Sequence, residues 1–376
     1  MRFFLYVFGA LFLVLSPLMV VSAQMVKPFN LCRNEVTRFV KLYSEGRSYT
    51  SFEISKTQEI FFSCIQSFQV WDQVVSMYLR VPYVEKILKR FSPKHFSLLQ
   101  NVRVFSPLVD QVIRLYPSFV GVDGEKRYLI LLQNNTELRP TGGFIGSFIY
   151  IVFKDGKLAE FRPEDIYIPD GQLKGYVKPP EPVETYLYQK GGWKLRDANW
   201  DPDFSQAAQT LLWFFEKGGY TNIDGVATIT LSAVQEYIKI LGPLYLPDYD
   251  KTIDAEGLYA FAQSQTEQGF FPGASNKRDV LGALTRALTR SMNALTLQKQ
   301  QELARTLLKH LASKDIMMWA KNSDVQAFIQ LHQWDGALHM PSCKTQECRA
   351  DYLYIVEANV GINKANCCID RKAQYE

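Results

Sequence analysis

Histidine and the short motifs of common enzymes are scarce in this sequence. Its 376 residues include only four histidines, and none lies near the polar loops described below. No serine-nucleophile elbow, zincin motif, Walker loop or dinucleotide fingerprint is present. The net charge is only +4, and no Lys/Arg cluster or zinc-finger spacing occurs. These absences argue against histidine-based acid–base chemistry and against a nucleic-acid partner.

Charged residues are also almost absent from the first 23 positions. After Met1-Arg2 comes an apolar run, Phe3 to Val21, which only Gly9, Ser16 and Pro17 interrupt. It ends in small residues that fit a signal-peptide cleavage site, but it is also long enough to span a bilayer, which takes about 20 apolar residues. We therefore interpret residues 1–23 as a signal peptide or membrane anchor. The rest of the chain is then either anchored at the outer face of the cytoplasmic membrane or secreted.

The six cysteines are disulfide candidates in an exported protein. Cys343 and Cys348 bracket four residues and could close a small ring, whereas Cys32 and Cys64 lie on two predicted helices. Zinc held by Cys343, Cys348 and either His332 or His339 is the alternative. The cysteine spacing is wider than in a usual zinc knuckle, which favours disulfides.

Hydrophobic periodicity divides the chain into parts. Apolar residues at helical spacing predict a helical stalk or bundle over 24–120. Strands then mix with helices, which predicts an α/β core over 121–335, a layered mixed sheet with flanking helices. The strongest predictions are strands at 127–133, 144–153, 157–161 and 223–230 and helices at 204–217, 276–294 and 297–312, with Ser232 and Gln235 as a capping box. A strand at 352–358 ends without a partner, so we interpret 336–376 as the start of a truncated β-rich region.

The loop 133–147 places polar chemistry between two predicted core strands. Its glycines allow a ligand to approach the main chain closely, and Arg139 could fork onto a phosphate or a carboxylate. The alternative is a polar turn braced by a structural ion pair. The candidate ligand-binding residues of this loop are Asn134, Asn135, Glu137, Gly142 and Gly143.

A second polar cluster, Arg196 to Phe204, lies just before a predicted helix. Helix N-termini attract anions, and Arg196 would add a bidentate positive charge. Asp197 and Asp203 could instead hold a divalent cation, or Asp203 could simply cap the helix. Asn199 and Trp200 are further candidate ligands here, and Lys277 with Arg278 begins a later helix. Between the two clusters, the Tyr- and Trp-rich stretch 162–202 has the length of a functional lid.

Four segments resemble the signatures of a bacterial envelope family, domain of unknown function 4012. They are Tyr128–Ser147, Arg196–Phe204, the pair Ile223–Ala227 and Leu241–Pro243, and Tyr354–Asn366. The layout is also similar to that of the LytR-CpsA-Psr envelope transferases, which bind polyprenyl-linked pyrophosphates with arginines and use aspartate-held Mg²⁺. The resemblance implies that Arg139 and Arg196 are phosphate ligands and that Asp197 is a metal ligand. Gln263 and Gln265 stand where that family has an arginine pair.

The resemblance and the polar loops together predict an exported cell-envelope protein that binds a lipid-linked (polyprenyl phosphate) glycopolymer. As an enzyme it would be a Mg-dependent glycopolymer phosphotransferase, with Arg139, Arg196 and Asp197 as catalytic residues and Mg²⁺ at Asp197 and Asp203. Its partners would be the membrane and the glycopolymer. Two alternatives stay open, a non-catalytic module for surface assembly, adhesion or glycan binding, and a scaffold whose polar loops only brace the fold.

Overall fold

The computed structural model describes most of the chain from residue 51 onwards. The described residues are 51–80, 84–91, 111–112, 114–122, 124–188, 191–267, 276–293, 295–343, 349–361 and 363–374, with Lys27, Asn30, Leu31, Asn34 and Leu108. The predicted signal peptide or anchor, residues 1–23, lies outside them. Among the helices that are described, none has both the length and the apolar character needed to cross a bilayer.

The elements follow one another in a regular order. They are α2 (Ser51–Leu79), α3 (Val84–Phe91), β1 (Glu125–Asn134), β2 (Phe144–Lys154), β3 (Lys157–Asp165), α5 (Tyr167–Asp170), α6 (Glu181–Val183), η1 (Glu184–Tyr188), η2 (Leu195–Asp197), α7 (Phe204–Lys217), β4 (Gly225–Thr230), α8 (Leu231–Leu241), β5 (Leu244–Leu246), η3 (Pro247–Tyr249), β6 (Lys251–Ile253), α9 (Gly257–Glu267), α10 (Asn276–Asn293), α11 (Leu297–Ser313), β7 (Ile316–Ala320), α12 (Ser323–Leu331) and η4 (Ala365–Cys368).

The chain divides into two compact units. One comprises Met1–Glu125 with Phe153–Leu158, and the other comprises Lys126–Val152 with Ala159–Glu376. The first unit contains α2 and α3, in the part of the chain predicted to be helical. The second unit contains both loops on which the functional predictions rest.

A five-stranded mixed sheet with the order β3-β2-β1-β4-β7 organises the core. Strand β1 is parallel to β4, with Gln133 beside Thr230, and β4 is antiparallel to β7. The predicted α/β class with a mixed sheet is therefore confirmed. Asp155 and Gly156 both have positive φ, 50° and 76°, as the predicted two-residue hairpin between β2 and β3 requires.

Strand β7 was not predicted. Its five residues are apolar and lie between two helices, and a run this short has no periodicity that separates strand from helix. It forms because β4 offers an open edge along which Ile316–Ala320 pair with Gly225–Ile229.

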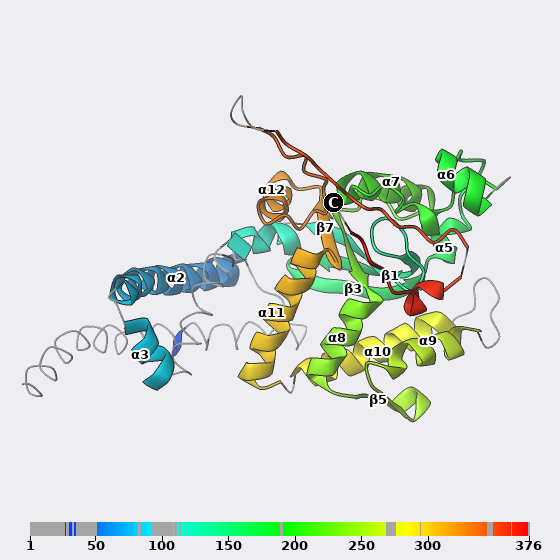
Figure 1. The fold of residues 1–376 in the computed structure, drawn as a ribbon. Helices are drawn as coiled ribbons and strands as arrows, with labels where there is room; N and C mark the ends of the chain where they lie inside the picture. The colour runs from blue at the N-terminus through cyan, green and yellow to red at the C-terminus, as the bar shows by residue number, and fades with distance from the viewer. Residues whose placement is uncertain are drawn as a thin grey trace, which may run out of the picture. The chain divides into compact units, whose positions relative to one another are not determined.

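Two apolar clusters stabilise the second unit. The larger one packs Leu129 and Leu131 of β1, alternate residues of the strand, with Phe204, Leu211 and Phe215 of α7. The smaller one joins α8, β5, β6, α9 and α10. In the view of Figure 1, α7 lies above β1 and α9 and α10 lie below it. Burial of these side chains fixes the ends of β1 and α7, from which the two polar loops extend.

Helix α7 begins as predicted, whereas α8 does not. The Asp203 side chain caps α7 by accepting hydrogen bonds from the backbone N–H groups of Ser205 and Gln206. Helix α8 is capped by Thr230, which accepts from Ala233 N–H, so the predicted capping box at Ser232 is wrong. Ser232 instead contacts Thr230 and Asn135 through its hydroxyl.

The predicted strand at 352–358 is also wrong. Residues 349–360 have no regular secondary structure, and every residue from 349 to 357 is exposed. The apolar alternation there suits a strand, but a strand also needs a neighbour, and this segment joins neither of the two described sheets. The segment continues into Asn359–Asn366, which forms hydrogen bonds with the loop between β1 and β2.

Candidate functional site

The loop between β1 and β2 is braced by its own backbone. Asn134 accepts hydrogen bonds from the backbone N–H and the hydroxyl of Thr136, and Phe144 N–H donates to the Glu137 carbonyl at 2.8 Å. Gly143 packs so closely on the preceding strand that a Cβ there would lie 2.3 Å from the Asn134 carbonyl oxygen. Glycine is therefore required at position 143 because the backbone of Asn134 lies against it, whereas the sequence suggested that a ligand would approach the main chain of this loop.

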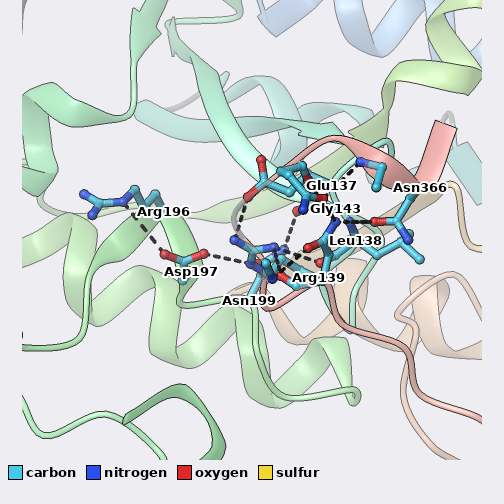
Figure 2. Close-up of polar contacts among 12 residues, drawn as sticks. Glu137, Leu138, Arg139, Gly143, Arg196, Asp197, Asn199 and Asn366 are labelled. Carbon is cyan, nitrogen blue, oxygen red and sulfur yellow. Dashed lines mark hydrogen bonds and ion pairs between the residues drawn. The ribbon is translucent and has the colours of Figure 1, made fainter. Parts of the chain in front are cut away.

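Arg139 is the centre of this loop and is almost completely buried, with 2% of its side chain exposed. Its Nε donates to Asp197 Oδ1 at 2.7 Å, and its Nη2 lies 3.0 Å from Glu137 Oε1. Its Nη1 donates to the carbonyl oxygens of Leu138 and Asn359, at 2.9 and 3.0 Å. Figure 2 shows these contacts converging on one guanidinium. Arg139 thus forms buried ion pairs, as expected if the loop is a polar turn braced by a structural ion pair.

Arg196 lies next to this cluster but is more accessible, with 24% of its side chain exposed. Its Nη1 donates to Asp170 Oδ2 at 2.7 Å, and its Nε lies 3.8 Å from Asp197 Oδ2. The rings of Tyr167 and Tyr188 lie 5.2 and 5.6 Å from its guanidinium carbon. Arg196 Nη2 has no hydrogen-bond partner among the described residues, so this arginine can still accept a ligand.

Asp197 connects the two arginines. Its Oδ1 accepts from Arg139, and its Oδ2 accepts from the hydroxyl of Tyr188. Burial, and after it the negative charge of Asp197, raises the pKa of Tyr188 above the usual range, so this hydroxyl keeps its proton. Trp193 donates its ring N–H to the Asp197 backbone carbonyl at 3.2 Å. The sequence prediction that places Arg139, Arg196 and Asp197 in one cluster agrees with this geometry.

Asp170 belongs to the cluster but was missed by the sequence analysis. It is buried, and its Oδ1 accepts from Leu195 N–H at 2.7 Å while its Oδ2 pairs with Arg196. Burial raises the pKa of the Asp170 carboxyl, and Arg196 opposes that effect. The only sequence signal is an aspartate between Pro169 and Gly171 in the aromatic stretch.

Asp170 gives a prediction about pH. Because its pKa is raised on folding, ionised Asp170 costs stability at neutral pH, and that cost disappears as the pH falls toward the ordinary carboxyl value of 3.8. The Asp170→Asn variant is free of this cost at every pH. We therefore expect its melting temperature, relative to that of the wild type, to fall as the pH is lowered from 7 to 4. Thermal unfolding followed at several pH values measures the difference, and a difference that stays constant or grows on acidification would contradict the argument.

Asn199 and its neighbours form a buried amide cluster under the glycine loop. Asn199 Nδ2 donates to the Gly143 carbonyl at 2.9 Å, and the Thr141 hydroxyl donates to the Asn199 carbonyl at 3.3 Å. Gln133 Nε2 donates to Thr141 at 3.2 Å. The side-chain oxygens of Gln133 and Asn199 have no partner among the described residues. Asn199 was predicted to bind a ligand, and in the structure its side-chain N–H holds the glycine loop through the Gly143 carbonyl.

Asn135 leads to a polar chain that the sequence analysis also missed. Its Nδ2 donates to the Ser232 hydroxyl at 2.9 Å, and Ser232 lies 3.0 Å from the Thr230 hydroxyl. Thr230 in turn donates to Asp315, which lies 3.0 Å from His310 Nδ1. These residues come from the ends of β4, α8 and α11, which periodicity predicts as separate elements. Asn135 is thereby held at the N-terminus of α8.

The remaining predicted residues occupy different places. Trp200 is half-buried, and Asp203 uses its carboxylate to cap α7 and to accept from Leu338 N–H at 3.1 Å. The side chains of Lys277 and Arg278 lie outside the described residues. Cys343 and Cys368 are each disulfide-bonded. Cys32, Cys348 and the side chains of Cys64 and Cys367 lie outside the description, so the predicted pairings stay predictions.

A metal site does not follow from the carboxylates as they are placed. Within the described residues, no three His, Cys, Asp or Glu side chains are grouped so that they could hold an ion. Asp197 is engaged by Arg139 and Tyr188, and Asp203 by backbone N–H groups. The donor set at Asp197 and Asp203 therefore does not fit a resident Mg²⁺.

The comparisons with known proteins support the sequence resemblance. Residues 123–266 match the model of a family described as "Protein of unknown function (DUF4012)". The recognition of this family is confirmed over that segment, which covers both polar loops. No curated protein matches the chain.

Several solved structures match this chain at low sequence identity and low TM-score. A Bacillus subtilis protein described as the transcriptional regulator yvhJ is 13% identical, covering 65% of this chain and 94% of that one, with a TM-score of 0.30. TagV of B. subtilis is 12% identical, with coverage of 65% and 95% and a TM-score of 0.29. TagT, solved bound to LIIa-WTA, is 9% identical, with coverage of 56% and 75% and a TM-score of 0.29.

Proposed function

We propose that this is an exported cell-envelope protein that binds the phosphate end of a lipid-linked glycopolymer, a polyprenyl phosphate carrying sugar, at Arg196. The observation that carries the proposal is the state of Arg196. About a quarter of its side chain is exposed beside two tyrosine rings, and its Nη2 has no partner among the described residues, whereas every nitrogen of the Arg139 guanidinium has one. A planar guanidinium held in this way binds phosphate oxygens well.

The surroundings of Arg196 suit a ligand with both a charged and an apolar part. Tyr167 and Tyr188 flank the guanidinium, and Trp193 packs on the core beside them. Tyr176 and Tyr186, on the same aromatic stretch, are 61% and 62% exposed. Aromatic rings of this kind pack against sugar faces and prenyl chains. The apolar run at residues 3–21 supports export, and the family resemblance supports an envelope partner.

Charge balance favours a second candidate, a non-catalytic module that binds a neutral glycan. Two arginines, Arg139 and Arg196, face three carboxylates, Glu137, Asp170 and Asp197. The cluster therefore has no surplus positive charge with which to attract a pyrophosphate. In the phosphate proposal, any Mg²⁺ would arrive with the ligand and would not reside at Asp197 and Asp203. In the glycan proposal, neither the ion nor Arg196 is essential.

Substitution of Arg196 separates the two candidates. Arg196→Ala removes a charge-assisted contact, so we expect polyprenyl phosphate to bind at least about tenfold more weakly. Arg196→Lys keeps the charge beside Asp170 but loses the fork, and an intermediate loss is expected. Native mass spectrometry of the full chain, purified from bacterial membranes with and without Mg²⁺, measures the bound lipid.

Arg162→Ala is the matched control. Arg162 also lies over a tyrosine, Tyr150 at 5.1 Å, and pairs with Glu160 and Glu164, but it is on β3, away from both loops. Its loss should leave lipid binding unchanged. The phosphate proposal is wrong if the wild type carries no lipid but binds an uncharged wall glycan. Equal binding of that glycan by Arg196→Ala would favour the glycan module.

A further inference from the structure

The segment Asn359–Asn366, here called the strap, lies along the Arg139 loop although more than 200 residues separate them. Asn359 N–H donates to the Leu138 carbonyl at 3.0 Å, and Asn366 N–H donates to the Thr136 carbonyl at 3.1 Å. Leu138 N–H donates back to Asn366 Oδ1 at 3.2 Å. Figure 2 shows Asn366 beside Leu138. The strap therefore pairs with the loop through backbone groups on both sides.

One strap contact falls on the guanidinium itself. Arg139 Nη1 donates to the Asn359 carbonyl oxygen at 3.0 Å. The other nitrogens of Arg139 are held by Asp197 and Glu137, which belong to the body of the unit. The Asn359 carbonyl thus occupies a donor that a ligand oxygen would otherwise use. It also accounts for part of the burial of Arg139, whose side chain is only 2% exposed.

The strap contacts the loop through polar groups, and its Lys364 Nζ lies 5.8 Å from the centre of the Tyr259 ring. None of the described residues from 349 to 374 is buried. Inside the strap, Asn359 Nδ2 lies 2.8 Å from the Asn363 carbonyl and 2.7 Å from Asn366 Oδ1. Just outside it, Glu357 and Arg371 form an exposed ion pair at 2.9 Å. The strap is therefore a preformed piece that can leave the loop without exposing apolar core.

We propose that the strap gates Arg139, and that an anionic ligand at the site displaces it. A phosphate oxygen is a stronger acceptor for a guanidinium than a neutral carbonyl, so the ligand gains Nη1 when the Asn359 carbonyl leaves. A ligand that binds only the open state shifts the balance toward it. This inference rests on the proposed function, because the displacing ligand is the phosphate that Arg196 first binds.

Two measurements on the full chain test the gate, with inorganic pyrophosphate and farnesyl pyrophosphate as probes, each with and without Mg²⁺. Hydrogen exchange follows the amides of Asn359 and Asn366, which should lose protection when a probe binds. Isothermal titration compares the wild type with Asn366→Ala, which loses the contacts to Leu138 and Asn359. Because a weaker strap opens more readily, Asn366→Ala should bind the probe about two- to tenfold more tightly. Val360→Ala, also in the strap but exposed and without a side-chain hydrogen bond, should bind like the wild type.

The outcomes distinguish this inference from the function on which it rests. Probe binding with the strap amides still protected, or weaker binding by Asn366→Ala, overturns the gate and leaves the phosphate site standing. Binding by Asn366→Ala with none by the wild type supports the gate. No binding by either protein, when both melt normally, overturns the gate and the phosphate site together.

Discussion

Replacing Asp197 by alanine should lower the free energy of unfolding by about 3–5 kcal/mol. The substitution leaves the Arg139 guanidinium buried without its closest partner, the carboxylate oxygen 2.7 Å from its Nε. Glu137 still faces Nη2, but removing one partner of a buried ion pair costs far more than the intact pair contributes. The Tyr188 hydroxyl and Arg196 lose a partner at the same time. Denaturant unfolding followed by tryptophan fluorescence measures the change, since five of the six tryptophans belong to this unit.

The matched control is the exposed ion pair between Asp248 and Arg286, in the same unit. Its nitrogen and oxygen lie 2.6 Å apart, but both side chains are more than half exposed. Asp248→Ala should therefore cost less than about 1 kcal/mol. The double variant Arg139→Met with Asp197→Ala should cost less than the sum of its parts, because it leaves no stranded guanidinium. If Asp197→Ala costs no more than Asp248→Ala, the cluster does not brace the loop.

Gly143→Ala should be the most damaging change in the glycine loop, at about 3 kcal/mol. A Cβ at this position would lie 2.3 and 2.4 Å from the carbonyl oxygen and carbon of Asn134. Both are backbone atoms of β1, so no side chain can turn away to make room. The Gly143 carbonyl would shift as well, and with it the hydrogen bond from Asn199. The expected result is a lower melting temperature and weaker ligand binding together.

Gly191→Ala is the control for this substitution. A Cβ there would meet only Tyr188, at 3.4 to 3.7 Å, which is ordinary van der Waals contact. Its melting temperature should be close to that of the wild type. An equally mild effect at Gly143 would show that the loop can move away from β1, and the loop would then be no rigid platform for Arg139.

The sequence predicts this site well where polar residues interrupt apolar strands. Gln133–Ser147 follows β1, and Arg196–Asp203 precedes α7, so both clusters are visible as polar chemistry at the ends of core elements. Their meeting, with Arg139 and Asp197 at 2.7 Å, agrees with the family resemblance. Their chemical roles do not follow from composition, because burial decides them. Arg139 is 2% exposed and Arg196 24%, although both are arginines in polar loops.

The partners that the sequence analysis missed are those brought in by tertiary structure. Asp170 lies in a stretch of short turns without periodicity, and Asn359 lies 220 residues from Arg139. Strand β7 exists because it pairs with β4, whereas the expected strand at 352–358 is absent because that segment pairs with neither edge of the sheet. Local propensity describes a segment alone, whereas each of these outcomes depends on what the segment meets.

The chemical make-up of the strap sets what can open it. The groups that the strap itself contributes to these contacts are peptide groups and carboxamides, neither of which gains or loses a proton between acid and alkaline conditions or attracts counter-ions strongly. In the described part of the chain, the charged groups in and near the strap include Lys364, over the Tyr259 ring, and the Glu357–Arg371 pair just outside it, and none of these contacts the loop in a hydrogen bond or ion pair. Wall acidity and ionic strength, which vary widely outside a cell, should therefore leave it in place. Opening then depends on an incoming molecule rather than on the surrounding medium.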